Sequence, residues 1–349
     1  MPIFFKSFHT RPQNTGRRIT ALLTAFALTA ALAGCASTED TAAAANTSEI
    51  SSSSVSEVQE STASEAWYTF EDSLGNPVVL QEQPQRVISL MGSYAETWML
   101  AGGELVGVTD DAVDERNLQL SEDVKIIGTQ HSPNLEEILG LSPDFVLLSA
   151  DIDEHLQLAE TLEKAEIPHA FFKVEYFDEY LDMLKICTDI TGREDLYQQN
   201  GLDVQDQIDQ VLAKIPEAGD DKPTVLFLRA MTTKAKAKSD DNMTCKMLED
   251  LGTVNIAAQD PSLLEDLSME KILMDDPDYI FAVPMGDTEK SLQALKDNIE
   301  SNPTWASLSA VQNGRYVILP KDLFHYKPNA RWGESYEYLA KILYPDLFE

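Results

Sequence analysis

The sequence predicts an α/β protein with two related lobes, each built around a mainly parallel sheet. The first observation is a repeat, because residues 134–147 (NLEEILGLSPDFVL) align with residues 268–281 (SMEKILMDDPDYIF), with Glu, Ile, Leu, Pro and Asp identical and most other positions alike in kind. Each copy is typical of a capping Asn or Ser, a short helix, a Pro-Asp break and an apolar strand. Such helix-to-strand breaks are common in α/β proteins, so a chance match is the alternative. The length of the match favours two lobes with one copy each.

The second observation is an alternation of apolar runs with helical patterns along the rest of the chain. Short apolar runs bounded by turn residues predict further strands at 86–90, 105–108, 170–173, 224–228, 279–283 and 315–319. Strands that alternate with helices are typical of a mainly parallel sheet with helices on both faces. Both halves of the chain follow this plan.

The chain begins with the features of a secretory signal. Residues 1–34 contain four basic residues and no acidic residue, and an apolar run at 21–33 ends just before Cys35. These features predict a signal peptide over 1–34. An uncleaved membrane anchor is the alternative, although the run is short for a membrane-spanning helix. The sequence LAGC at this place resembles the bacterial lipobox, so Cys35 is expected to become the lipidated N-terminus.

The composition of the following residues divides the chain further. Residues 35–66 are mostly Ser, Thr, Ala and Glu, which predicts a solvated tether behind the lipidated cysteine. The fold is predicted to begin at Trp67, with a hairpin around Gly75-Asn76-Pro77. We expect an N-terminal lobe over 67–190, one long polar helix over 191–216 that starts with a capping box at Thr191, and a C-terminal lobe over 217–349.

The charge of the chain excludes some partners. The formal net charge is −33, so the surface repels nucleic acid and anionic lipid. An anionic small ligand would therefore depend on local basic residues. Besides Cys35 the chain has only Cys187 and Cys245, which fall in different lobes. Cys187 lies on the apolar face of a predicted helix, which favours a buried thiol over a disulfide.

Several motifs occur in the order found in one known family. They are PQRVISL after the hairpin, a helix that ends in Gly-Gly, PNLEEILGLSPDFVLLS, LGTVNIA and WASLSAVQNGRYVILP. From Trp67 to Leu343 the chain resembles the class III substrate-binding proteins of ABC importers, which carry ferric siderophores, haem or cobalamin. The resemblance implies two Rossmann-like lobes joined by one long helix, with the ligand in the cleft between them. Together with the lipobox, it implies a lipid-anchored protein at the cell surface, on the outer face of the cytoplasmic membrane.

The resemblance also implies a protein partner. In the family, one glutamate on each lobe pairs with arginines of the permease dimer, and the matching residues here are Glu136 and Glu270. Each is predicted in the first turn of a helix, where the helix dipole favours a negative charge. The alternative is that both are simply favourable first-turn residues.

Loops at the carboxyl ends of the strands are expected to face the cleft. The candidate ligand-binding residues are Met91, Tyr94, Trp98, His131, Arg229, Lys234, Lys236, Met285, His325, Tyr326, Lys327, Arg331 and Trp332. In haem-binding members of the family, the iron ligands come from the loops that here carry His131 and Met285. The haem propionates would then meet Arg229, Lys327 or Arg331.

Other ligands and other classes of protein stay open at this point. An anionic ferric siderophore would be held by the basic residues of that set, with Tyr94, Trp98 and Trp332 as apolar walls, and cobalamin ranks third. In each case the iron complex or cobalamin is cargo, and no intrinsic cofactor is expected. The few scattered histidines do not favour a zinc or manganese receptor. The absence of GxSxG, Walker A and GxGxxG sequences does not favour an enzyme, and a surface adhesion module would not need two matched glutamates.

Overall fold

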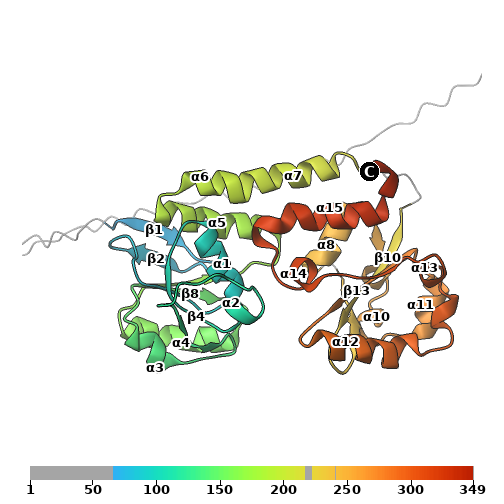
Figure 1. Ribbon diagram of the computed structural model, residues 1–349, viewed down its shortest axis with the longest axis horizontal. Helices are drawn as coiled ribbons and strands as arrows, with labels where there is room; N and C mark the ends of the chain where they lie inside the picture. Colours follow the sequence, from blue (N-terminus) through green and yellow to red (C-terminus); the bar gives the residue numbers. More distant parts are fainter. Residues whose placement is uncertain (1–65, 217–221, 240, 349) are drawn as a thin grey trace, which may run out of the picture. The chain divides into compact units, whose positions relative to one another are not determined.

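The structure is a computed structural model that describes residues 66–216, 222–239 and 241–348. The predicted signal peptide, Cys35 and all but the last residue of the predicted tether lie outside the described residues. Residues 62–349 belong to one compact unit. Within it, the described helices and strands form two lobes, each around a five-stranded sheet (Figure 1).

The N-terminal lobe has a sheet that is parallel throughout, in the order β5-β4-β3-β8-β9. Its strands are β3 (Val87–Ser89), β4 (Leu105–Val108), β5 (Lys125–Ile126), β8 (Phe145–Ser149) and β9 (His169–Phe172). Its helices are α1 (Gly92–Leu100), α2 (Asp111–Asp114), α3 (Leu135–Gly140), α4 (Asp153–Lys164) and α5 (Phe177–Thr191). The antiparallel hairpins are β1 (Tyr68–Glu71) with β2 (Pro77–Leu80), and β6 (Gly128–Thr129) with β7 (Ser132–Pro133). In this sheet β3 and β8 are neighbours at the point where the strand order reverses, as in a Rossmann-like lobe.

Strand β8 shows why the sequence of a central strand is apolar at every position. Phe145 and Leu147 pack into one hydrophobic cluster with α1 and α5, whereas Val146 and Leu148 pack into another with α3 and α4. Successive side chains of a strand point to opposite faces, so a sheet covered on both sides buries all of them. Each such side chain contributes about 1.5–3 kcal/mol to stability through burial.

The C-terminal lobe repeats this plan with the strand order β11-β10-β13-β14, and β12 beside β10. Its strands are β10 (Thr224–Ala230), β11 (Ala235–Ala237), β12 (Val254–Asn255), β13 (Tyr279–Pro284) and β14 (Tyr316–Ile318). All pairs are parallel except β10 with β11. Its helical segments are α8 (Met243–Asp250), α9 (Ile256–Gln259), α10 (Ser262–Glu265), α11 (Met269–Asp275), α12 (Thr288–Leu295), η2 (Lys296–Glu300), η3 (Trp305–Ser307), α13 (Ser309–Gln312), α14 (Lys321–Phe324), η4 (Asn329–Arg331), α15 (Trp332–Leu343) and η5 (Pro345–Leu347). The predicted α/β class with two mainly parallel sheets is confirmed.

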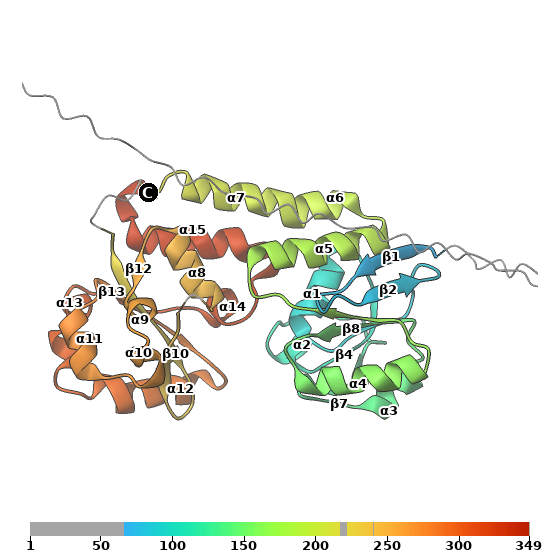
Figure 2. The same cartoon turned by 180° about the vertical axis from the view of Figure 1, so that it is seen from behind.

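The connection between the lobes is one helical segment, which consists of α6 (Glu194–Tyr197), the π-helical turn η1 (Gln198–Leu202) and α7 (Asp203–Leu212). It begins later and ends earlier than the predicted helix over 191–216. Thr191 is the last residue of α5, and its hydroxyl donates to the carbonyl of Ala101 at 2.6 Å, so the predicted capping box does not form. Figures 1 and 2 show α15 lying along α7. Through these helices, one apolar cluster includes buried residues of both lobes.

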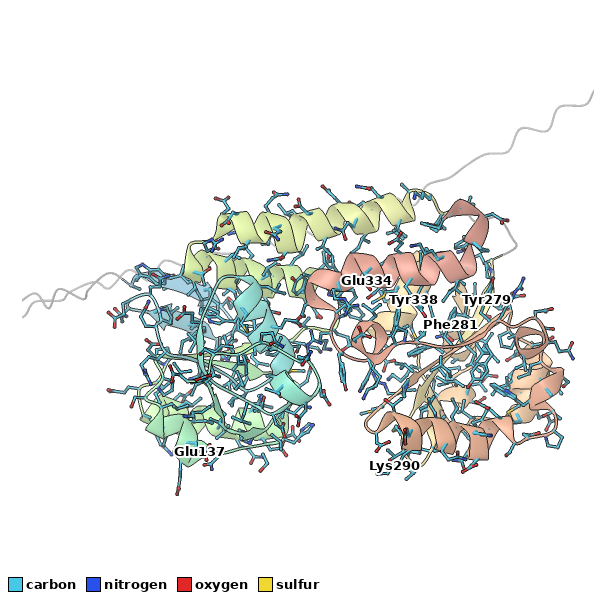
Figure 3. All side chains as sticks on the ribbon, in the orientation of Figure 1. Glu137, Tyr279, Phe281, Lys290, Glu334 and Tyr338 are labelled. Atoms are coloured by element: carbon cyan, nitrogen blue, oxygen red, sulfur yellow. The ribbon has the colours of Figure 1, made fainter. Side chains whose placement is uncertain are left out.

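The two copies of the repeat have the same local structure. Asn134 caps α3 by accepting from the backbone N–H groups of Glu136 and Glu137, and Ser268 caps α11 by accepting from that of Lys271. Each cap satisfies donors that have no partner within the helix and contributes roughly 1 kcal/mol. The glutamates of α3 lie on its outer surface, where Figure 3 shows Glu137 projecting from the helix.

The Pro-Asp break after each helix is equivalent as well. Asp144 accepts from the backbone N–H groups of Gln85 and Arg86 at 2.7 and 2.8 Å, just before β3. Asp278 accepts from the backbone N–H of Thr224 at 2.8 Å, at the start of β10. Each aspartate therefore ties the strand of its repeat to the neighbouring strand. The two aspartates thus have the same structural role in the two lobes.

Candidate functional site

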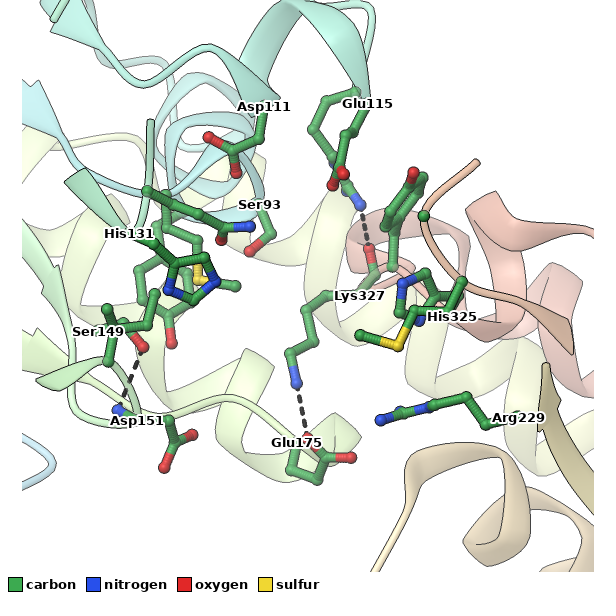
Figure 4. A pocket seen from close by; sticks show the side chains of 18 of the residues that line it. Ser93, Asp111, Glu115, His131, Ser149, Asp151, Glu175, Arg229, His325 and Lys327 are labelled. Carbon is green, nitrogen blue, oxygen red and sulfur yellow. Dashed lines mark hydrogen bonds and ion pairs between the residues drawn. The ribbon is translucent and has the colours of Figure 1, made fainter. Parts of the chain in front are cut away.

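A cavity of about 670 Å³ lies between the two lobes, at the carboxyl ends of their strands (Figure 4). The N-terminal lobe contributes Met91, Ser93, Tyr94, Asp111, Glu115, Arg116, Gln130, His131, Ser149, Asp151, Ile152 and Glu175. The C-terminal lobe contributes Arg229, Met231, Thr232, Thr233, Met285, Gly286, His325, Tyr326 and Lys327. Ligands of open α/β sheets bind at this place, because the loops after the strands converge there. The volume is that of a small-molecule site.

The structure brings most of the candidate residues together. Those that line the cavity are Met91, Tyr94, His131, Arg229, Met285, His325, Tyr326 and Lys327. The sequence analysis did not identify Asp111, Asp151 and Glu175, which follow β4, β8 and β9, or Glu115 and Arg116, which follow α2. The position after a strand is a signal for the first three, but an anionic iron complex favours basic and aromatic side chains.

The two tryptophans do not line the cavity, which corrects the prediction. Trp98 is 2 % exposed, and its indole N–H donates to the carbonyl of Glu104 at 2.9 Å. Trp332 is 1 % exposed and packs edge-on against Phe177. Both lie on helix faces that turn toward the apolar core, so they stabilise the fold instead of forming walls for a ligand.

Three of the predicted basic residues also lie away from the cavity. Arg331 is held on the surface by ion pairs with Asp322 and Glu334, each at 2.7 Å. Lys234 and Lys236 line a separate groove beside α10. Lys236 is exposed whereas the next residue, Ala237, is buried, since neighbouring side chains of the edge strand β11 point to opposite faces.

His131 occupies the turn of the β6–β7 hairpin on the N-terminal side of the cavity. Its side chain is 67 % exposed, and its Nδ1 lies 3.9 Å from a carboxylate oxygen of Glu154. Figure 4 shows its imidazole directed into the cavity, opposite His325 and Arg229. An exposed imidazole in a cavity can coordinate iron or accept a hydrogen bond from a ligand.

A buried histidine supports this hairpin and was not found from the sequence. His155 of α4 accepts from the backbone N–H of Ser149 through Nδ1, and donates to the carbonyl of Gln130 through Nε2, both at 2.9 Å. Since Ser149 offers a donor, the imidazole is neutral with its proton on Nε2. Burial lowers the pKa of His155 to about 4. No sequence motif distinguishes it from a histidine on the helix surface.

The C-terminal wall of the cavity has two polar atoms without a partner. Within the described residues, Arg229 Nε and His325 Nδ1 are buried and make no hydrogen bond. Burial, followed by the charges of Arg229, Lys321 and Lys327, lowers the pKa of His325 to about 4, so its imidazole is neutral near pH 7. Buried polar groups nearly always have partners, so these two atoms are candidates for hydrogen bonds with a bound molecule.

Several contacts connect the lobes around the cavity. Lys327 donates to Glu175 at 2.7 Å, and the carbonyl of Lys327 accepts from Arg116 at 2.7 Å. Arg116 also forms an ion pair with Glu96, which accepts from the amide of Asn329 as well. These contacts hold the segment after α14 against the N-terminal lobe.

Two carboxylates on the N-terminal side differ in their accessibility. Asp111 accepts from the backbone N–H of Gly92 and from the hydroxyl of Thr109, both at 2.6 Å, and is almost fully buried. Burial raises the pKa of Asp111, although these two hydrogen bonds oppose the rise. Asp111 therefore anchors α1 and α2, whereas Asp151 is exposed and its carboxylate lies 3.8 Å from the ammonium group of Lys173. Within the described residues, no group of three or more His, Cys, Asp or Glu side chains could hold a metal ion.

Comparison with known proteins bears on the fold and the site together. A family model described as "Periplasmic binding protein" matches residues 87–323, which include both sheets and nearly all of the cavity. The chain belongs to the periplasmic binding protein family. Together with the two-lobed fold, this confirms the predicted class III substrate-binding protein. Within the described residues, no helix combines the length and apolar character needed to cross a membrane.

Three similar proteins are described with three different ligands. The Fe(3+)-citrate-binding protein YfmC of Bacillus subtilis is 24 % identical over 243 residues, which cover 68 % of this chain and 74 % of YfmC. The structure of Staphylococcus aureus IsdE complexed with heme has a TM-score of 0.61 at 18 % identity, covering 74 % of this chain and 98 % of IsdE. That of S. aureus SirA complexed with staphyloferrin B has a TM-score of 0.59 at 20 % identity, covering 80 % of this chain and 98 % of SirA. The two structures show a shared fold.

Proposed function

We propose that this periplasmic binding protein captures an iron complex, with haem favoured, and delivers it to the permease of an ABC importer. The observation that carries the proposal is the cavity itself. His131 projects into it from the N-terminal lobe, and the C-terminal wall offers Met285 together with the unpartnered Nε of Arg229. The chemistry of these side chains suits a metal complex with carboxylate groups.

His131 and Met285 are the proposed iron ligands. Met285 is 37 % exposed at the carboxyl end of β13, so its thioether is accessible from the cavity. His and Met side chains together are a known pair of haem iron ligands. Arg229 would bind a propionate, and its buried Nε–H would gain the acceptor that it lacks.

A ferric siderophore or ferric citrate is the second candidate. It is supported by one relative named for Fe(3+)-citrate and by a protein of the same fold complexed with staphyloferrin B. Such a ligand would use Arg229 and Lys327 without direct coordination by His131. Cobalamin ranks third.

Titration with hemin separates these candidates. We expect a one-to-one shift of the Soret band for the chain from Trp67 onward. His131→Ala and Met285→Ala should each alter the spectrum and weaken binding at least about tenfold, since a lost ligand costs no less than a lost supporting partner. The matched controls are His169→Ala and Met274→Ala, which lie outside the cavity. A flat titration would exclude haem, and ferric citrate would then be tested in the same way.

The proposed docking residues for the permease dimer are Glu136 and Glu270. Both are exposed in the first turns of the equivalent helices α3 and α11, where the duplication presents one carboxylate on each lobe. Glu136→Arg with Glu270→Arg should abolish permease-dependent uptake and leave ligand affinity unchanged. Uptake at the wild-type rate would contradict this docking surface.

The proposed location is the cell surface, with the protein anchored by lipid on Cys35. The support is the LAGC sequence and the B. subtilis relative YvrC, which is named a substrate-binding lipoprotein. Cys35→Ala should move the protein from the membrane fraction to the medium. Retention of this variant in the membrane fraction would contradict lipid anchoring.

A further inference from the structure

One cation of the cavity is already neutralised by the protein. Glu175 follows β9 in the N-terminal lobe and Lys327 follows α14 in the C-terminal lobe, and their side chains form an ion pair at 2.7 Å. The exposed fractions are only 26 % for Glu175 and 17 % for Lys327. Figure 4 shows this pair inside the cavity, between His131 and Arg229. An anionic ligand that needs Lys327 must therefore compete with Glu175.

The surroundings of the pair separate its charge from its structural contacts. Glu175 also accepts from the backbone N–H of Met243 at 3.2 Å, at the first turn of α8. The backbone of Lys327 is held independently, because its carbonyl accepts from Arg116. A glutamine at position 175 could keep the bond to Met243 through its one carbonyl oxygen, and would lose the negative charge and the bond to Lys327.

The charges of the cavity nearly balance. Among the described residues that line it, the carboxylates are Asp111, Glu115, Asp151 and Glu175, and the permanent cations are Arg116, Arg229 and Lys327. Arg116 is paired with Glu96, Lys327 with Glu175, and the carboxylate of Asp151 with Lys173 at 3.8 Å. Within the part of the chain that the structure describes, Arg229 is thus the cavity cation for which no carboxylate partner lies within ion-pair distance. One carboxylate of a ligand can be neutralised there, whereas further negative charges would face the carboxylates of the wall.

We propose that Glu175 determines specificity by limiting the negative charge of the bound ligand. It neutralises Lys327, so that the cavity accepts a complex with one carboxylate-bearing edge and disfavours a polyanionic complex. Selectivity of this kind rests on a repulsive element as well as an attractive one. The inference deepens the proposed function, since it rests on an iron complex being the ligand.

Glu175→Gln tests the proposal, with hemin and ferric citrate as probes in calorimetric titrations. We expect the variant to bind ferric citrate at least about tenfold more tightly than the wild type, because close charge pairs have coupling energies of that size. Its affinity for hemin should change by less than about threefold. Lys327→Met should bind ferric citrate more weakly than the wild type. The matched control is Glu337→Gln on α15, which removes a carboxylate paired with Lys341 outside the cavity and should alter neither affinity.

Unchanged binding of ferric citrate by Glu175→Gln would overturn the proposal, as would an equal gain for both probes. Thermal unfolding of each variant shows that it is folded. A nonspecific effect would not strengthen ferric citrate binding in Glu175→Gln and weaken it in Lys327→Met. Failure of the proposed function has a different signature, because the wild type would then bind no hemin. The ferric citrate comparison would still decide the role of Glu175.

Discussion

The residue that positions His131 is a second histidine. His155 is fully buried, and its ring joins the end of β8 to the hairpin through Ser149 and Gln130. The bond from Ser149 needs the neutral ring, because a proton on Nδ1 would face the N–H of Ser149. The protonation state of His155 is thereby linked to the position of His131, the proposed iron ligand.

The pKa of His155 predicts an acid-dependent loss of stability. Its value is about 4 in the fold and about 6.5 when exposed, so the unfolded chain binds the proton more readily. The contribution of the neutral ring is fully present above pH 6.5 and is lost as the pH falls toward 4, by at most about 3 kcal/mol. Urea unfolding of the ligand-free protein between pH 7 and pH 4.5 measures it.

His155→Gln is the variant for comparison, because its amide offers an acceptor and a donor that do not titrate in this range. Its free energy of unfolding should depend less steeply on pH than that of the wild type. His325, whose pKa is also about 4, contributes the same slope to both proteins. Parallel curves for the two proteins would contradict the role of His155.

At this scale, the sequence predicts the position of a side chain along a strand or helix, but not its direction. Residues after strand ends, such as His131 and Met285, reach the cavity because parallel strands place their carboxyl ends together. The predictions that Trp98 and Trp332 line the cavity were wrong, because a small change of position around a helix determines whether a side chain faces the core or the surface. Glu175 was missed because its role depends on Lys327, 152 residues away in the chain, and His155 because no motif distinguishes it from a histidine on the helix surface.

Among the elements, the β6–β7 hairpin carries the proposed iron ligand His131 in its turn. It has two residues on each side, and Gly128 at its base has φ +104°. A Cβ at Gly128 would lie 2.5 Å from the carbonyl oxygen of Ser132, across the hairpin. The hairpin therefore needs glycine both for its backbone conformation and for the close approach of its two strands.

Gly128→Ala should shift the hairpin and weaken hemin binding in parallel with His131→Ala. The expected loss of stability is about 2 kcal/mol or more, from strain and overlap together. Gly192→Ala is the matched control, because Gly192 has φ +70° but no atom within 4 Å of its Cβ position. It should cost only about 1 kcal/mol and leave hemin affinity unchanged. Equal affinities for the two variants would show that the hairpin does not position the ligand.

The helix ends also show which sequence signals predict the structure correctly and which do not. The repeat predicted both caps correctly, because Asn134 and Ser268 act within their own helices. The capping box at Thr191 was wrong because α5 continues to that residue, and its hydroxyl bonds to Ala101, 90 residues earlier. Local signals thus locate elements well, and tertiary contacts decide where they end.

For the whole molecule, the decisive feature is the way in which the lobes are joined. The segment α6–η1–α7 and the helix α15 lie along each other, and one apolar cluster runs through them into both lobes. The resemblance to a family predicted one long helix, whereas the contribution of α15 depends on the packing of the C-terminus. Asn329, just before α15, donates to the carbonyl of Ser93 at 2.9 Å, which adds a polar link.

This joint predicts a small closing motion when a ligand binds. Hinge closure needs a few residues that absorb large backbone changes, and two packed helices with a buried apolar cluster resist such changes. Scattering profiles of the free and hemin-bound protein should therefore nearly coincide. Arg116→Ala removes the bond to the carbonyl of Lys327 and should widen the difference between the two profiles, while the helices and the cluster remain. A large decrease in the radius of gyration of the wild type on binding would show instead that the lobes rotate about the connection, and that the contacts around Lys327 form only after closure.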